Sequence, residues 1–277
     1  MLGIGLALAA SLSWGLSDYL GGVKSRIVPL LTLIAVSQLA GLALIGVITG
    51  TTSSFPDGRT AAYGAIAGAA GVAAVAAFYR GMAIGRISIV APVSATGAVI
   101  PVVVGLARGE RPGSLALVGM ALAFVGVVLA SAEDEPGGTR SLAAGVPLAL
   151  VAAFGFGIFF LFVAKASEGD HALSAAFMLR LTTVPLILLA MLALRQPFRV
   201  PRGNLHWLVL IGALDSGANT LFALATNHGL LSLVSVLGSL YPLSTVLLAQ
   251  ALLREHVARH QKFGIAAALA GVALISI

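Results

Sequence analysis

Three charged residues lie within otherwise apolar stretches of this 277-residue chain: Asp18, Arg180 and Asp215. A charge in a hydrocarbon environment is costly unless it is paired or hydrated, so each is a candidate for a functional site. Asp215 could contact a substrate or accept a proton, or it could form a structural ion pair with Arg180. The planar guanidinium group of Arg180 could equally hold the carboxylate of a substrate, because it matches the geometry of that group.

Asp18 and Asp215 have different sequence surroundings. Asp18 shares a helical face with Trp14 and lies about one turn from the end of its apolar run, so it could also reach the interface and pair with Lys24. Asp215 and Asn219 are four residues apart, which places them on one face of a helix. That spacing predicts a polar stripe directed into the protein.

Further candidates are polar or aromatic side chains inside apolar segments. An aromatic ring there could stack on a ligand, or it could face lipid or a neighbouring helix. The predicted substrate-binding residues are Asp215, Asn219, Arg180, Asp18, Trp14, Ser94, Ser239 and Tyr241.

The sequence offers little for a metal or another cofactor. It has no cysteine, and His256 and His260 are four apart but flank a charged corner without the glutamate of a metalloprotease helix. We therefore expect no metal site, no cofactor and no catalytic residue.

Composition indicates the kind of element that positions these residues. The chain is 59% hydrophobic and only 9% charged, whereas about a quarter of the residues of a soluble protein are charged. Apolar runs of about twenty residues, long enough to cross a bilayer as helices, recur from end to end. The net charge of +6 comes from Lys and Arg between these runs, where topology and lipid head groups explain it better than nucleic acid does.

The fold class that we predict is an all-α membrane protein with ten transmembrane helices. The expected spans are Leu2–Gly22, Pro29–Thr49, Ala61–Tyr79, Ile87–Ala107, Gly113–Ala132, Leu142–Ala164, Ala172–Leu194, Leu205–Thr226, Leu230–Leu253 and Ala258–Ile277. A polar corner at 133–141 separates the fifth span from the sixth.

The segment 94–131 recurs without a gap as 239–276. The two copies share Ser94/Ser239, Glu110/Glu255, Gly119/Gly264, Gly126/Gly271 and Ser131/Ser276. We infer a duplicated five-helix unit, with one copy at 1–132 and the other at 142–277. Because five is odd, the second copy enters the membrane from the opposite side, which makes an inverted repeat.

Two features of the repeat carry structural predictions. The glycines, seven residues apart, fall on one face of their helix. The shared glutamate indicates a shared structural task, such as capping the following helix or, for Glu110, pairing with Arg111.

Inverted repeats place their substrate site near the membrane midplane, at helices interrupted in corresponding positions. The expected helix breaks are Pro92, Gly97, Pro101, Gly238 and Pro242. The alternative is that each proline merely bends a spanning helix for packing.

These motifs together resemble one family over essentially the whole chain. The motifs are Leu12-Ser13-Trp14-Gly15, the corner before Pro92, Gly109-Glu110-Arg111 followed by Gly119 and Gly126, Arg180, Pro242, and Arg254-Glu255 followed by Gly264 and Gly271. The chain is similar to the EamA type of the drug/metabolite transporter superfamily. The resemblance implies two inverted five-helix units around a central cavity that move small metabolites across a cytoplasmic membrane, often outward.

Orientation is the point on which the charges and the resemblance disagree. The resemblance implies cytoplasmic termini, which would leave four basic residues in the inner corners and eleven in the outer ones. Basic residues favour the cytoplasmic side, so the charge count favours the opposite orientation.

We therefore expect a secondary transporter of small metabolites, amino-acid-like or other organic solutes, that works by alternating access in the export direction. Its partners would be the substrate and membrane lipids, without nucleic acid, and it would be a monomer or a weak homodimer. The alternatives are a non-transporting scaffold or sensor and, less favoured, an intramembrane enzyme with Asp18 and Asp215 as paired carboxylates. The chain has no phosphate-binding loop for direct use of ATP.

Overall fold

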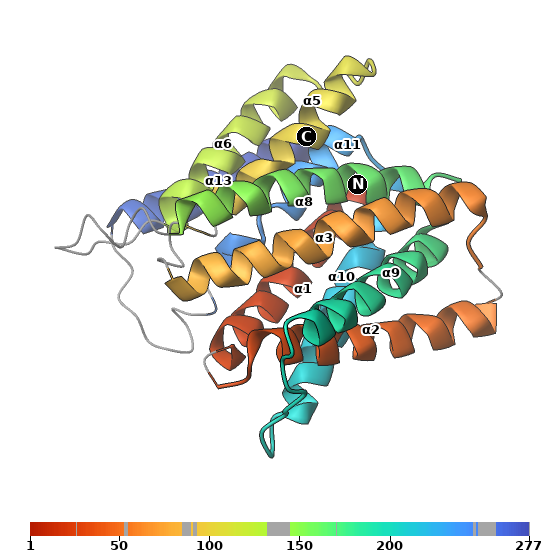
Figure 1. Ribbon diagram of the computed structural model, residues 1–277. Coiled ribbons are helices and arrows are strands. Elements are labelled where there is room, and N and C mark those ends of the chain that lie inside the picture. The colour runs from red at the N-terminus through yellow and green to blue at the C-terminus, as the bar shows by residue number, and fades with distance from the viewer. Residues whose placement is uncertain are drawn as a thin grey trace.

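The computed structural model describes residues 1–25, 27–52, 55–84, 90, 93–131, 145–169, 171–245, 248 and 259–276. These residues form helices joined by turns and short extended segments, with no strand among them. Figure 1 shows a bundle of long helices. The prediction of an all-α protein is confirmed for this part of the chain.

The helices of the first half are α1 (Leu2–Lys24), α2 (Leu30–Thr52), α3 (Gly58–Ile84), the 3₁₀ turn η1 (Thr96–Ala98), α5 (Val99–Ala107) and α6 (Ser114–Ser131). Those of the second half are α8 (Val146–Ser167), α9 (Ala172–Ala193), α10 (Leu205–Asn227), α11 (Leu231–Gly238) and α13 (Arg259–Ser276).

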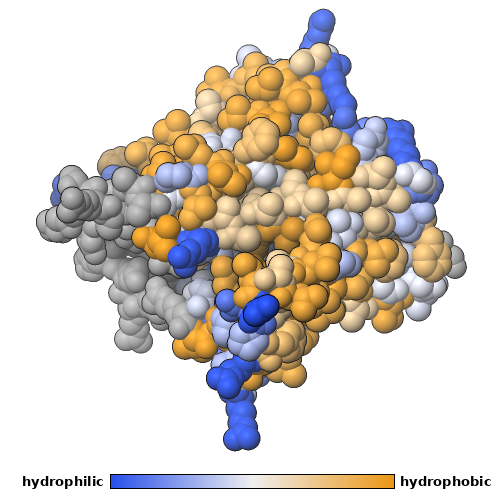
Figure 2. Space-filling model, in the orientation of Figure 1, coloured by the Kyte–Doolittle hydropathy of each residue, from blue (hydrophilic) through white to orange (hydrophobic). Residues whose placement is uncertain are grey.

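Five of the described helices are long and apolar enough to cross a membrane: α2, α3, α8, α9 and α10. Four shorter apolar helices cover 93–107, 114–129, 231–245 and 262–275. Large apolar side chains lie on the outside of the bundle, as expected where the solvent is lipid, and Leu189 is 60% exposed. Figure 2 shows apolar side chains over most of one face and hydrophilic ones towards its margins. The chain is thus a multi-pass membrane protein, while the number of ten crossings stays a prediction.

The repeat glycines lie where α6 meets α13, which run side by side (Figure 1). A Cβ added to Gly119 would lie 2.7 Å from the carbonyl oxygen of Gly271, and one added to Gly126 would lie 2.7 Å from that of Gly264. The earlier glycine of each helix therefore faces the later glycine of the other, so the two helices are antiparallel. Small residues let the two backbones approach this closely.

Other helix contacts also recur when the halves are exchanged. α1 of the first half packs against α10 of the second, and the equivalent pair with the halves exchanged, α8 and α3, is also in contact. The equivalent helices α2 and α9 pack against each other, and α5 packs against α11. Residues from both halves therefore meet throughout the bundle.

Four of the five expected helix breaks lie within the described residues. Gly97 lies in η1, at the start of the segment that continues as α5, and Pro101 is buried within α5. Gly238 is the last residue of α11, and Pro242 is buried in the short helical segment that follows the turn at 239–240. Pro92 lies outside the described residues.

Candidate functional site

The charged residues of the second half form a buried ion pair. Nη2 of Arg180, on α9, lies 2.7 Å from Oδ2 of Asp215, on α10. Arg180 is only 2% exposed, and its other terminal nitrogen, Nη1, donates a hydrogen bond to Oε1 of Gln38. The structural ion pair considered from the sequence is therefore present, and the guanidinium group is already occupied by protein groups.

Gln38, on α2, connects this ion pair to the first half of the chain. Its Oε1 also accepts a hydrogen bond of 3.0 Å from the Thr183 hydroxyl, and its Nε2 lies 3.4 Å from Oδ2 of Asp215. Gln38 is not among the residues predicted from the sequence. A buried amide in an apolar run is a comparable signal, since it too must find hydrogen-bond partners.

The close packing of α2 against α10 and α9 holds this network together. A Cβ added to Gly41 would lie 3.2 Å from Nε of Arg180 and 3.3 Å from the carbonyl oxygen of Gly212. Gly212 itself contacts the backbone of Ser37. The glycines therefore allow the side chains of three helices to meet within hydrogen-bond distance.

Asn219 lies one turn after Asp215 on the same face of α10. Its Nδ2 is 3.5 Å from Oδ1 of Asp215, while its Oδ1 is buried and has no hydrogen-bond partner. The predicted polar stripe is thus present, with one acceptor left unsatisfied.

Asp18, on α1, has a different set of neighbours. The hydroxyl of Tyr79, on α3, donates to Oδ1 of Asp18 at 3.3 Å. Asp18 does not pair with Lys24, which was the structural alternative. Lys24 instead donates to Asn204 at 3.2 Å, and its ammonium group lies 4.9 Å from the centre of the Trp207 ring.

The helices that carry the two carboxylates are in contact beside them. The Ser17 hydroxyl, next to Asp18, donates to the carbonyl oxygen of Ile211 at 3.2 Å, and that of Ser13 donates to the carbonyl oxygen of Leu214, next to Asp215, at 2.8 Å. On the same helix, a Cβ added to Gly15 would lie 2.9 Å from the carbonyl oxygen of Tyr241. The structure therefore brings together Asp18, Tyr241, Asp215, Asn219 and Arg180 from the predicted set.

Trp14 packs on an aromatic cluster of the second half. Its ring lies 5.7 Å from that of Phe160 and 5.6 Å from that of Phe222, between ring centres. Tyr241 belongs to a neighbouring cluster, with ring centres 6.3 Å from Phe78 and 6.4 Å from Phe156. Its hydroxyl is buried and makes no hydrogen bond.

The two repeated serines bond to backbone carbonyl groups three or four residues before them, and the Ser94 hydroxyl also lies 3.5 Å from the carbonyl oxygen of Ala149 on α8. The Ser94 hydroxyl donates to the carbonyl oxygen of Val90 at 2.7 Å, and that of Ser239 donates to the carbonyl oxygen of Val236 at 2.8 Å. Hydroxyl groups commonly satisfy themselves in this way inside helices. Neither serine makes a described hydrogen bond with the network around Asp215, and their contact with substrate stays a prediction.

The repeated Glu110 does cap a helix, but not the one that follows it. Its Oε1 accepts the backbone N–H of Leu231 at 2.8 Å, and its Oε2 accepts that of Ser232 at 3.0 Å. These are the first residues of α11, in the other half of the chain. Capping, one of the structural tasks considered for Glu110, is therefore present, but the capped helix is not the one that follows it. Arg254 and Glu255 lie outside the described residues.

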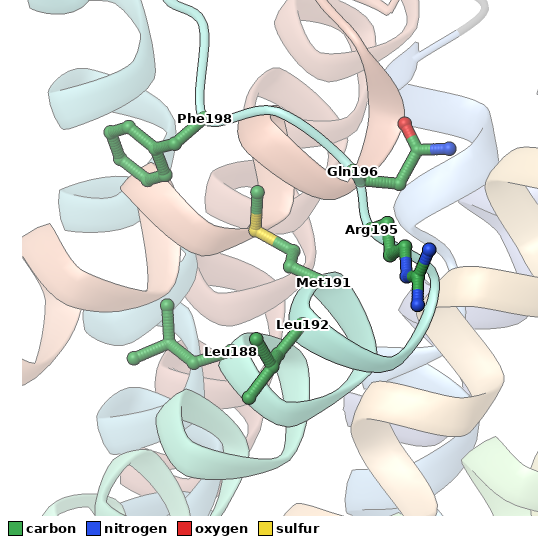
Figure 3. Close-up of a pocket in the computed structure, with 6 residues that line it drawn as sticks. All are labelled: Leu188, Met191, Leu192, Arg195, Gln196 and Phe198. Atoms are coloured by element: carbon green, nitrogen blue, oxygen red, sulfur yellow. The ribbon is translucent and has the colours of Figure 1, made fainter.

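A separate surface pocket lies at the carboxyl end of α9 (Figure 3). Its lining is mainly apolar and consists of Leu188, Met191, Leu192, Arg195, Gln196 and Phe198. It contains none of the predicted site residues. Across the described ranges, no cluster of His, Asp or Glu could hold a metal ion.

Apolar helices around a buried cluster of charged and amide side chains define a multi-pass helical membrane protein with a polar interior site. The family model of EamA-like transporters matches residues 1–132 and 143–277. The chain therefore belongs to the EamA-like transporter family, whose members are membrane transporters, in agreement with a non-enzymatic function.

Two further comparisons concern curated proteins and solved structures. No curated protein matches the chain. A solved structure, described only as the crystal structure of a protein, covers 98% of this chain and 95% of its own, with a TM-score of 0.78 and 18% identity. At that identity the likeness concerns the fold.

Proposed function

We propose that this protein is a secondary transporter that carries small organic solutes across the cytoplasmic membrane by alternating access. The two moving units would be 1–132 and 142–277, inverted relative to each other and joined by 133–141, with five membrane helices each. The observation that carries the proposal is the polar network in which Gln38 of one half bonds to Arg180 and Asp215 of the other.

The network supports a site whose shape depends on the arrangement of the halves. Asp18 and Gln38 come from the first half, and Arg180, Asp215 and Asn219 from the second. A relative movement of the two halves must lengthen or break the hydrogen bonds between them. A substrate that bonds to the same groups would therefore bind the two arrangements with different affinity, as alternating access requires.

The inverted arrangement is supported by the antiparallel crossing of α6 and α13 at paired glycines. It is also supported by the contacts that recur on exchange of the halves, such as α1 with α10 and α8 with α3. In an inverted repeat, equivalent helices meet across a local two-fold axis and must run in opposite directions.

Finer parts of the proposal follow the family resemblance. We propose export, with cytoplasmic termini, of amino-acid-like or other small organic solutes, by a monomer or weak homodimer surrounded by lipid. A paired-carboxylate enzyme gains no support, because Asp215 bonds to Arg180 and shares no described hydrogen bond with Asp18.

Solute flux in proteoliposomes tests the proposal. Purified protein would be reconstituted into vesicles loaded with a labelled panel of amino acids, amines and small organic acids, and efflux followed against protein-free vesicles. We expect efflux of at least one solute class to be accelerated by the protein and by an excess of unlabelled solute outside, the signature of a carrier. A scaffold or sensor would leave the efflux of every solute at the protein-free rate, and that result would refute the proposal.

A further inference from the structure

The site contains more acidic side chains than basic ones. Two carboxylates, Asp18 and Asp215, stand against one cation, Arg180. Arg180 is committed to Asp215 at 2.7 Å and to Gln38. Within the described part of the chain Asp18 has no ion-pair partner, and its one hydrogen-bond donor is the neutral hydroxyl of Tyr79. The two acidic side chains therefore share a single basic one.

The carboxylates are also more accessible than the guanidinium group. The side chain of Arg180 is 3% exposed and that of Asp215 is 24% exposed, and Asp18 is likewise only partly buried. The acidic groups are therefore the more exposed part of the cluster. An anion could reach Arg180 only by displacing Asp215 or Gln38, each of which already bonds to it.

Two buried polar atoms beside the carboxylates lack partners. Oδ1 of Asn219, one turn from Asp215, is an unused acceptor, and the buried Tyr241 hydroxyl, which can accept as well as donate, bonds to no group. Buried polar atoms are rarely left unsatisfied in a folded protein, so the Asn219 oxygen points to a ligand that supplies a hydrogen-bond donor. A protonated amine carries donors and no acceptor.

The walls near Asp18 are aromatic. The ring of Tyr79 lies 5.7 Å from that of Phe78, and Phe78 and Phe156 both contact the ring of Tyr241. Aromatic faces attract cations and offer an apolar surface to the body of a ligand. The combination of acid and aromatic groups distinguishes an organic cation from a metal ion, which would instead need several oxygen ligands.

We propose that this site binds small organic cations, protonated amines with an aromatic or apolar body, whose charged group lies between Asp18 and Asp215. The inference rests on the proposed function and names its substrate class. The ammonium group donates to the carboxylate of Asp18 and to Oδ1 of Asn219, while the body of the ligand packs against Tyr79 and Tyr241. Arg180 stays with Asp215 and keeps the total charge of the occupied site near zero.

Three probes of nearly equal size test the charge preference on the unmodified full-length protein. They are 2-phenylethylamine, which is a cation at neutral pH, 2-phenylethanol, which is neutral, and 3-phenylpropionate, which is an anion. Affinity would be measured by isothermal titration calorimetry in detergent. We expect the amine to bind at least about tenfold more tightly than the other two, as one hydrogen bond to a charged group allows. Equal affinities, preference for the anion, or no binding of the amine would overturn the inference.

Substitutions of Asp18 test whether this residue causes the preference for the amine. Asp18→Asn should weaken binding of the amine about tenfold or more and leave the weak binding of the alcohol unchanged. Asp18→Glu should restore much of the affinity for the amine. Asp57→Asn is the matched control, because Asp57 is an exposed carboxylate in the turn before α3 and outside the site. Unchanged affinity for the amine in Asp18→Asn would overturn the inference, and the comparison of the three probes on the unmodified protein does not depend on that variant folding.

The flux assay separates this inference from the proposed function. Selective binding of the amine without carrier-type flux of any solute would refute the transporter and leave the cation site standing. Flux of a neutral or anionic solute without binding of the amine would overturn the cation site and leave the transporter standing.

Discussion

The carboxylate of Glu110 caps the helix that begins at Leu231, with Oε1 2.8 Å from the backbone nitrogen. The two residues belong to opposite halves of the chain, 121 positions apart. Glu110 follows α5, and α5 packs against α11. The corner after one helix thus fixes the start of its partner, so the two helices cannot separate at this end while the cap is intact.

Glu110→Ala should lower the stability of the protein. The change leaves the N–H groups of Leu231 and Ser232 without an acceptor, and loss of a helix cap typically costs about 0.5 to 2 kcal/mol. Thermal unfolding of the purified protein in detergent would measure the loss. Glu110→Gln should lose less, because its amide oxygen can still accept one bond. A matched control is Glu168→Gln, which removes an exposed ion pair with Arg59 and should change stability little. Equal midpoints for Glu110→Ala and the unchanged protein would contradict the role of the cap.

Gly126→Ala should destabilise the crossing of α6 and α13. The new methyl group would lie 2.7 Å from the carbonyl oxygen of Gly264 and close to the backbone of Ala268, and neither can move aside as a flexible side chain could. Overpacking of this kind costs about 1 to 3 kcal/mol.

The control for Gly126→Ala is Gly5→Ala, on α1. A Cβ there meets nothing within 4 Å, so the substitution should be neutral or stabilise the helix by about 0.5 to 1 kcal/mol. Comparison of the two thermal midpoints checks the prediction. A midpoint for Gly126→Ala at or above that of Gly5→Ala would show that the helices do not approach this closely.

The stability of the protein should fall more when one partner of the buried pair of Arg180 and Asp215 is replaced than when both are. Arg180→Met removes the cation and leaves Asp215 with only weak amide donors, and breaking a buried ion pair in this way costs about 3 to 5 kcal/mol. Arg180→Met with Asp215→Leu removes both charges, so the double variant should be more stable than Arg180→Met alone. A double-mutant cycle of unfolding free energies gives the coupling directly. Additive effects of the two substitutions would mean that the pair does not interact in the folded protein.

The sequence predicted which residues form this site better than it predicted the groups to which they bond. Charges within apolar runs identified Asp18, Arg180 and Asp215, because a membrane helix tolerates a charge only for a reason. Gln38 was missed because, unlike the amide of Asn219, it has no charged residue on its own span to mark a polar face. The seven-residue glycine spacing predicted a packing face on α6.

Local sequence could not identify which helix packs on a given helix face, or which helix a given side chain caps. The repeat predicted a structural role for Glu110, but its partner, Leu231, is determined by the assembly of the two halves. The same reason explains why Lys24 does not take the alternative of pairing with Asp18: its partners, Asn204 and Trp207, are remote in sequence, whereas Asp18 is near in sequence. Contacts between halves depend on the three-dimensional arrangement, which neither composition nor periodicity encodes locally.

Asp57 should make the start of α3 sensitive to acid. Its Oδ1 accepts the backbone N–H of Thr60 at 2.7 Å, and this hydrogen bond holds the pKa of Asp57 below its usual value of 3.8. A carboxylate with a lowered pKa stabilises the folded state above the pKa of the unfolded chain, and the contribution is lost as the pH falls through the lowered value. The contribution should therefore be complete above about pH 5 and decrease as the pH falls below about 4. Asp57→Asn keeps an acceptor oxygen without the titration, so the difference in thermal midpoint between the two proteins should be constant at neutral pH and shift in favour of Asn as the pH falls below 4. A difference that does not change across this range would exclude Asp57 as the acid-sensitive cap.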